Sequence, residues 1–467
     1  MLLQVGSAFF SFGTVWLISK RIGSEGYGGL VAILAASQVA QILVNWTSFA
    51  VARFGTEEFI ETEKIARAFW LRLFVLVPNF LLVLAASRFW FPPLAAWLKL
   101  PPEYFWFVIL HFVLAAFWIH VQFGLQAAKL PRKQGFLLTV ERLLILLGVG
   151  VLILLGKLSP LAALVCYLIA AASVIAAGLF QLRHYLFARF TVDWDFTRRI
   201  LAYSVPLLPF SLIGYFSGGY VDAVFVSKFL STRDLGVYSI ATQISGIALQ
   251  LPTLANTLLL PMFVSLQKES GHERLSNYFG SVLPGLTLLW GIGCAVLSFA
   301  GAVAIPLVFG AEFEAATLPL WILLAASIFA IPVMLGYASL SNATSATWVA
   351  MFSAIFSAAA NIGANFLLIP KYGMAGCAWA TLIAYFVSVT TFALLLRRSA
   401  KIPLGWTFPA ALPSLAAAAF FTFRQTPWAA LLICLIASFL VGYFFKTSLL
   451  KTISFLRNYR GKADSLG

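Results

Sequence analysis

The chain has 467 residues, of which 61% are hydrophobic and 10% are charged, and its mean hydropathy is +0.95. Soluble globular proteins carry about 25% charged residues, so this composition excludes that class and indicates a polytopic membrane protein. The formal net charge of +15 comes from 31 Lys and Arg against 16 Asp and Glu.

Fourteen membrane-spanning helices are predicted, because about 20 apolar residues cross roughly 30 Å of hydrocarbon. The expected fold is therefore an all-α polytopic membrane protein. If the amino terminus is cytoplasmic, 22 Lys and Arg lie on the inner side and 9 on the outer side. The positive-inside rule then places both termini in the cytoplasm, and the same distribution argues against a nucleic-acid partner. The approximate spans are 2–19, 28–50, 68–86, 104–126, 136–156, 161–181, 202–226, 237–262, 281–300, 316–338, 348–369, 376–396, 407–424 and 429–445.

The stretch 215–239 looks like a second copy of the way the chain begins. With Lys228 set over Lys20, a shift of 208 residues, Gly236 falls on Gly28. In both copies an apolar helix runs into Ser-Lys, then a short loop, then a glycine that opens the next helix. We therefore expect two pseudo-repeated six-helix bundles.

The expected lobes are 1–200 and 201–400, and residues 401–467 supply two extra transmembrane helices and a basic cytoplasmic tail. The seventh span opens with Pro206 and Pro209. Proline removes a backbone hydrogen bond and kinks a helix, and broken helices are tolerated at membrane depth only beside protein or water. We expect a hinge at these two residues.

The second predicted span carries a row of polar side chains. Its members are three or four residues apart and share one helical face: Gln38, Gln41, Asn45 and Ser48. Such a row either faces a cavity, where Asn45 would contact substrate, or joins helices by hydrogen bonds. Gln243 and Asn256, on the eighth span, are the candidate substrate-binding residues of the second lobe.

Arginines gather near the inner side of the first lobe. Arg53, Arg67 and Arg72 either bind an anionic headgroup or reflect the ordinary inner-side excess of positive charge. Glu141 and Arg142 come where the fifth span is already apolar. These two are therefore better candidates for a cavity than for a loop.

Asp222 lies among apolar residues of the seventh span, six positions before its predicted membrane exit at Lys228. A charge at that depth is costly in lipid, so its side chain should face a cavity or a partner. A buried charge in a pseudo-repeated bundle suggests a transporter, because such folds place substrate sites where their repeats meet.

His111 and His120 on the fourth span are interpreted as core or interface histidines, with a proton relay as the alternative. No catalytic residues are identified. The four cysteines lie within apolar spans and lack metal-ligand spacing, so neither disulfides nor a metal site is expected. They are Cys166, Cys294, Cys377 and Cys434.

Two phrases late in the chain are similar to phrases of a known family. The first, VAIPLVFGAEFEAATLPL, contains Val308, Phe309, Gly310, Phe313 and Ala316. The second, NIGANFLLIPKYGMAGCAWAT, contains Asn365, Ile369, Pro370, Gly373, Gly376, Ala378 and Thr381. Both resemble the polysaccharide biosynthesis flippases, which transfer oligosaccharides of the lipid-linked O-antigen type, within the multidrug, oligosaccharidyl-lipid and polysaccharide (MOP) exporter superfamily.

The resemblance extends to the seventh span, since the family commonly has an acidic residue there, followed by Gly-x-Tyr. Here these are Asp222 and the segment 236–238. Cys377 departs from the family's usual Ala, and the chain is shorter before the first helix than is usual.

The resemblance implies a flippase that moves a polyprenyl-pyrophosphate-linked oligosaccharide from the inner to the outer leaflet of a bacterial inner membrane. Alternating access of the two lobes, coupled to H⁺ or Na⁺ and with no other cofactor, would drive transport. Arg53, Arg72 and Arg142 are then expected to meet phosphates or acidic sugars, because Arg offers bidentate geometry to anions. Asp222 would pair with one of them or accept the coupling ion. The expected partners are the lipid-linked oligosaccharide, membrane lipids and polysaccharide polymerase machinery.

Three alternatives stay open. A cation-coupled multidrug exporter of the same superfamily would favour acidic over basic cavity residues. A peptidoglycan lipid-precursor flippase would use the same fold on a related substrate. A membrane glycan polymerase would be an enzyme with a large outer loop, whereas the outer loops predicted here are short.

Overall fold

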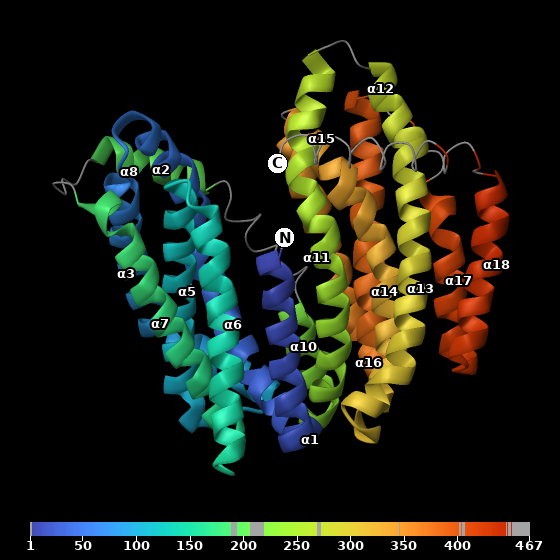
Figure 1. Ribbon diagram of the computed structural model, residues 1–467, viewed down its shortest axis with the longest axis horizontal. Helices are drawn as coiled ribbons and strands as arrows, with labels where there is room; N and C mark the ends of the chain where they lie inside the picture. The colour runs from blue at the N-terminus through green and yellow to red at the C-terminus, as the bar shows by residue number, and fades with distance from the viewer. Residues whose placement is uncertain are drawn as a thin grey trace. The chain divides into compact units, whose positions relative to one another are not determined.

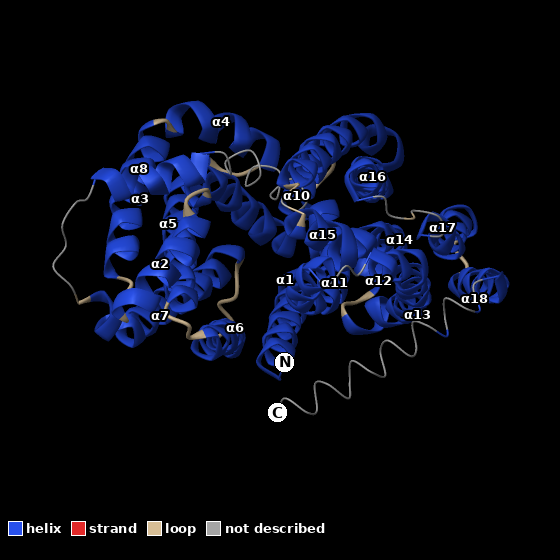
Figure 2. Cartoon of the chain, turned by 90° about the horizontal axis from the view of Figure 1, so that it is seen from above, coloured by secondary structure: helices blue, strands red, loops and turns tan. Residues whose placement is uncertain are grey.

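The computed structural model describes residues 2–187, 194–205, 219–268, 272–344, 346–400, 403, 407–444, 446 and 450. Across these residues the secondary structure is helical and contains no strand (Figure 2). Eight helices in the described ranges are long and apolar enough to cross a membrane. The predicted class, an all-α multi-pass membrane protein, is confirmed.

The chain forms two compact units, Met1–Ser239 and Ile240–Gly467. The division into pseudo-repeated lobes near residue 200 stays a prediction. Pro206 and Pro209, the expected hinge, lie outside the described residues.

The first unit is a bundle around its first helix. The helices are α1 (Leu2–Asn45), α2 (Ser48–Thr62), α3 (Ala66–Ala85), α4 (Ser87–Leu98), η1 (Pro102–Tyr104), α5 (Phe105–Ala127), α6 (Pro131–Leu154), α7 (Pro160–Leu186), α8 (Trp194–Ser204) and α10 (Gly219–Phe229). Helix α1 packs against α5, α6, α7 and α10. Figure 1 shows α3, α5, α6 and α7 running alongside one another, with α2 and α8 at one end.

Helix α1 contains the first predicted span and most of the second. They meet at Gly23, whose φ of 68° interrupts the helical backbone. Glycine has no Cβ, so it adopts this left-handed φ at little cost. The short loop predicted after Arg21 is therefore a glycine kink.

Glu58 joins the end of α2 to the start of α3. Its carboxylate accepts hydrogen bonds from the backbone N–H groups of Arg67 and Ala68, both at 2.9 Å. These groups lie in the first turn of α3, where a carboxylate satisfies free N–H groups and complements the helix dipole. Burial raises the pKa of Glu58, while the two N–H groups oppose that shift. The cap fixes the second half of α2 beside the first turn of α3.

The two glycines that the repeat aligned pack directly against each other in the first unit. Helix α11 (Thr232–Lys268) begins here. A Cβ built on Gly28 would lie 1.9 Å from the carbonyl oxygen of Thr232, and one on Gly236 would lie 1.9 Å from that of Ser24. Ser24 and Thr232 are themselves 208 residues apart. The contact is reciprocal: each glycine packs on the backbone four residues before the other.

The second unit is also a helical bundle. Its helices are α12 (His272–Asn277), η3 (Tyr278–Val282), α13 (Leu283–Val308), η4 (Ala311–Ala316), α14 (Thr317–Pro332), η5 (Val333–Tyr337), α15 (Ala338–Ala343), α16 (Thr347–Ala400), α17 (Thr407–Arg424) and α18 (Pro427–Phe444). Helix α14 packs against α13, α16 and α17, and α13 packs against α17 and α18. In Figure 1 these long helices lie side by side.

The second family-like phrase forms a sharp kink inside α16. Gly373 has φ 59°, and a Cβ on Gly376 would lie 2.3 Å from the carbonyl oxygen of Leu368. The glycines therefore let the chain turn tightly and approach its own backbone. The kink separates the predicted spans 348–369 and 376–396.

Candidate functional site

A row of polar side chains lines the second half of α1. Gln41 is buried and accepts a hydrogen bond from Asn45 Nδ2 at 3.5 Å. The Gln41 Nε2 donor and the Asn45 Oδ1 acceptor have no hydrogen-bond partner within the described residues. Buried polar groups are normally paired, so these two atoms are available to water or to a ligand.

The row ends at a fully buried arginine. Arg72 of α3 is 0% exposed. Its Nε donates to Thr47 Oγ1 at 3.3 Å and its Nη2 donates to Ser48 Oγ at 2.7 Å. Both hydroxyl groups lie where α1 gives way to α2. Arg72 therefore ties this junction to α3.

The third partner of Arg72 is His120 of α5. Arg72 Nη1 lies 2.6 Å from His120 Nδ1, and the imidazole packs against the Phe69 ring with centroids 4.0 Å apart. Arginine is always protonated and can only donate, so Nδ1 must accept and the imidazole proton lies on Nε2. That Nε2 has no hydrogen-bond partner in the described part of the chain.

No carboxylate within the described residues balances the charge of Arg72. The hydrogen-bond partners of Arg72 are all neutral groups: the Thr47 and Ser48 hydroxyls and the His120 imidazole. The sequence predicts that Arg72 meets substrate phosphates, but this structure encloses its guanidinium. A substrate could reach it only after the contacts of α1 and α2 with α3 and α5 had opened.

His111 binds the start of the same polar row. Its Nδ1 lies 2.5 Å from Ser37 Oγ, and Ser37 Oγ also lies 3.0 Å from the carbonyl oxygen of Leu34. A hydroxyl carries one proton and a carbonyl only accepts, so Ser37 donates to Leu34 and His111 donates from Nδ1. The two histidines therefore use opposite tautomers and different partners. Each is anchored as a core histidine would be.

Arg142, unlike Arg72, is partly accessible. It is partly buried in α6, eleven residues from Pro131, a rise of about 16 Å along the helix. It makes no hydrogen bond or ion pair with another described residue. Its neighbour Glu141 is buried and accepts a hydrogen bond from Trp118 Nε1 at 3.1 Å. Arg142 is thus, among the described residues, a cation without a counterion in a helix long and apolar enough to cross a membrane.

Asp222 is buried in α10, at 5% exposed, as the sequence predicts. Its Oδ2 accepts a hydrogen bond from Tyr238 Oη at 2.9 Å. No ion pair joins it to a predicted site arginine, namely Arg53, Arg72 or Arg142, within the described residues. The tyrosine from the start of α11 holds the carboxylate, and the pairing of Asp222 with a site arginine stays a prediction.

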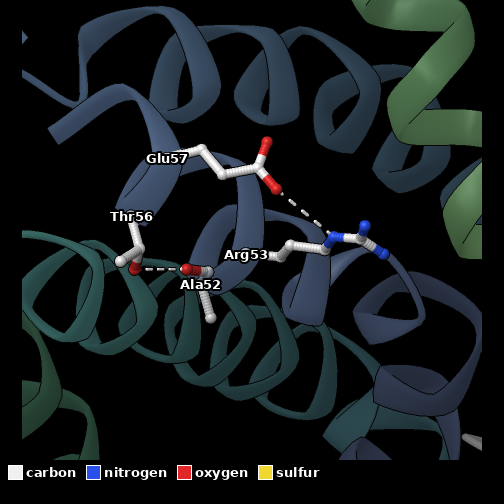
Figure 3. Close-up of polar contacts among 4 residues, drawn as sticks. All are labelled: Ala52, Arg53, Thr56 and Glu57. Atoms are coloured by element: carbon white, nitrogen blue, oxygen red, sulfur yellow. Dashed lines mark hydrogen bonds and ion pairs between the residues drawn. The ribbon is translucent and has the colours of Figure 1, made fainter. Parts of the chain in front are cut away.

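Arg53 lies on the surface of α2. Its Nε is 3.5 Å from Glu57 Oε1, and its guanidinium stands over the Tyr203 ring, 4.7 Å from the centroid. Figure 3 shows the ion pair beside the hydrogen bond from Thr56 Oγ1 to the Ala52 carbonyl oxygen, at 2.6 Å. The exposed ion pair is weak in water. Arg53 therefore remains able to exchange Glu57 for another anion.

The candidates of the eighth span lie on α11. Gln243 is partly buried, and Asn256 lies in a stretch of α11 whose side chains are outside the described part. Both belong to the second unit. The first unit thus brings together Asn45, Gln41, Arg72 and the two histidines, and the binding role of every candidate stays a prediction.

The similarity of the chain to known proteins identifies its family. Residues 1–267, more than half of it, match the family model described as "Polysaccharide biosynthesis protein". The chain belongs to the polysaccharide biosynthesis protein family. This membership confirms the resemblance seen in the sequence.

A curated relative of this family member is the probable low-salt glycan biosynthesis flippase Agl15 of Haloferax volcanii. The two are 23% identical over 216 residues. That alignment covers 45% of each chain, so it spans less than half the length of the relative.

Solved transporters share the fold. The lipid II flippase MurJ, in an inward closed conformation, matches with a TM-score of 0.73 at 14% identity, over 96% of this chain and 99% of MurJ. An inward-facing MATE multidrug resistance transporter of the MOP superfamily matches with a TM-score of 0.63 at 15% identity, over 84% and 94% of the two chains. The Vibrio cholerae MATE transporter VcmN, in its bent form, gives a TM-score of 0.53 at 15% identity, over 86% and 98%. The polysaccharide biosynthesis protein described here therefore has a MOP-type transporter fold, and the named functions of these proteins are transport functions.

Proposed function

We propose that this protein is a flippase that carries a polyprenyl-pyrophosphate-linked oligosaccharide from the inner to the outer leaflet of a bacterial inner membrane. Its family and the fold that it shares with named flippases support transport of a lipid-linked glycan. A sugar headgroup and a pyrophosphate cannot enter hydrocarbon without leaving many polar groups unsatisfied. A polar path through the protein removes that penalty while the lipid tail stays in the bilayer.

Arg142 is the observation that carries the proposal. It is partly exposed, lies in a helix long and apolar enough to cross a membrane and makes no ion pair with a described residue. A charge in this position is costly unless it faces a cavity or an anion. A pyrophosphate would satisfy it, because guanidinium groups bind phosphate oxygens in bidentate geometry. The free polar atoms of Gln41 and Asn45 would then serve the hydroxyl groups of the sugars.

Asp222 is the proposed coupling residue. Its carboxylate is buried and held by the Tyr238 hydroxyl. Binding of H⁺ or Na⁺ there would remove or balance a buried negative charge. Because Tyr238 lies in α11 and Asp222 in α10, the ion would change the contact between consecutive helices and so bias alternating access.

A second candidate is a lipid-linked peptidoglycan precursor, favoured by the TM-score of 0.73 with MurJ. This substrate would bind the same unpaired arginine, Arg142. A cation-coupled drug exporter is less favoured, because the acidic groups Glu141 and Asp222 are bound by Trp118 and Tyr238, while Arg142 has no described counterion.

Arg142→Ala is expected to lower surface polysaccharide about tenfold or more in a strain that depends on this protein, since a charge-assisted hydrogen bond contributes about 1.5–3 kcal/mol. Asp222→Asn should lower it as well by blocking ion binding. Surface polysaccharide is measured for both variants at normal levels of the protein. Arg132→Ala, an exposed change in the same helix, is the control and should retain full output. Undiminished polysaccharide from both variants would count decisively against the proposal.

A further inference from the structure

Helix α8 has two apolar faces, and the first is buried within the protein. Phe196 and Ile200 are 8% and 1% exposed and join a core cluster with Phe54 of α2 and Leu71 of α3. The Phe54 and Phe196 rings meet edge to face, with centroids 5.6 Å apart. This face anchors α8 on the bundle.

The second apolar face of α8 has no cover in the described structure. It borders an open groove of about 440 Å³, lined by Trp194, Thr197, Arg198, Leu201, Ala202 and Val205. Trp194 is 70% exposed and Val205 is 55% exposed. Trp194, Leu201 and Val205, the residue after the last turn of α8, are seven and four residues apart and so share one helical stripe, with Arg198 between the first two. An apolar stripe of this kind on a short surface helix is typical of membrane-interface helices.

One arginine lines the groove, and two more lie over rings packed at the buried face of α8. Arg198 is the one that lines the groove. Arg199 stands over the Phe54 ring at 5.6 Å, and Arg67 stands over the Phe196 ring at 4.2 Å. Arg198 and Arg199 make no ion pair within the described ranges. Contact with a ring face leaves the N–H donors at the edge of the guanidinium available to an anion.

We propose that this face of α8 binds an anionic phospholipid of the inner leaflet. The phosphate lies at Arg198 and Arg199, and the acyl chains follow the stripe formed by Trp194, Leu201 and Val205. Tryptophan concentrates at the membrane–water interface, and juxtamembrane arginines attract anionic headgroups. Positive charge beside an apolar groove complements a lipid that is negative at one end and apolar at the other. This site is independent of the proposed transport function.

Lipid binding to the purified full-length protein tests the site. Native mass spectrometry would compare phosphatidylglycerol with phosphatidylcholine of identical acyl chains. The wild type should bind phosphatidylglycerol at least about tenfold more tightly, and Arg198→Gln with Arg199→Gln should remove that preference. The matched control, Arg132→Gln with Lys133→Gln, removes the same charge from the exposed start of α6 and should change it less than about twofold. Equal affinity of the wild type for the two lipids, or equal losses in both double variants, overturns the proposal.

A single variant, an apolar double variant and a competitor complete the test. If the double variant unfolds, Arg198→Gln alone serves, because Arg198 lines the open groove and should still contribute to phosphatidylglycerol binding. Leu201→Ser with Val205→Ser should weaken binding of both lipids by shortening the apolar stripe. A polyprenyl phosphate is the competitor. Displacement of phosphatidylglycerol by an equal concentration of it would assign the groove to substrate and contradict the lipid site.

Discussion

Gly28→Ala and Gly236→Ala are each expected to prevent normal assembly and to abolish transport. The new methyl group would lie 1.9 Å from a backbone carbonyl oxygen, that of Thr232 in one case and of Ser24 in the other. Real Cβ contacts are never this short, so one helix would have to move. Overpacking against side chains costs about 1–3 kcal/mol, and a backbone carbonyl cannot turn aside as a side chain can. The expected destabilisation therefore lies at or above the top of that range.

Thermal unfolding of purified protein and surface polysaccharide in cells both measure this effect. Two controls replace a glycine with alanine at positions where the added methyl group has space. Gly29→Ala, on the next residue of α1, meets Pro160 Cγ at 3.9 Å, and Gly246→Ala on α11 meets no atom within 4 Å. Both should behave as wild type. A normal unfolding midpoint and normal polysaccharide for Gly28→Ala would show that these helices do not meet as described.

Arg72→Ala is expected to destabilise the protein, in contrast to Arg142→Ala. Removal of Arg72 leaves His120, Thr47 and Ser48 without their partner and opens a cavity in the bundle. Such losses amount to about 2–5 kcal/mol. Arg142 has no described partner to lose, so its truncation should leave the unfolding midpoint near that of the wild type and lower transport alone.

The measurement is the unfolding midpoint in detergent together with protein level in the membrane. Arg72→Lys should be intermediate, because an ammonium group cannot reproduce the fork of three hydrogen bonds. If Arg72→Ala folds with a wild-type midpoint while transport falls, Arg72 is a binding residue, as the sequence alone suggests, and its enclosure here is incidental.

The eight candidate membrane spans of the described ranges follow from hydropathy because each contains a long apolar run. Two surface helices do not. Helix α2 mixes Arg53, Glu57 and Glu58 with aromatic residues, and α8 is only eleven residues long, so neither has the composition of a span. Each is held by packing one narrow face against α3 and against the other surface helix. Hydropathy does not detect such packing.

The site is predictable where it depends on local spacing. Gln41 and Asn45 share a face because they are four residues apart, and they do meet in the structure. The partners of Arg72 and His111 lie on other helices, and His120 is 48 residues from Arg72. Such contacts are set by how the helices pack. For the same reason the sequence does not predict the hydrogen bond between Asp222 and Tyr238, which lie on consecutive helices.

Transfer of a labelled polyprenyl-pyrophosphate-linked oligosaccharide between the leaflets of proteoliposomes is the most direct test of the flippase. The label is read with a membrane-impermeant glycosidase, which reaches the outer leaflet only. Wild-type protein should expose the inner-leaflet pool far faster than protein-free vesicles do, and Arg142→Ala should slow that exposure about tenfold or more. Wild-type vesicles that expose it no faster than protein-free ones would contradict the proposed function.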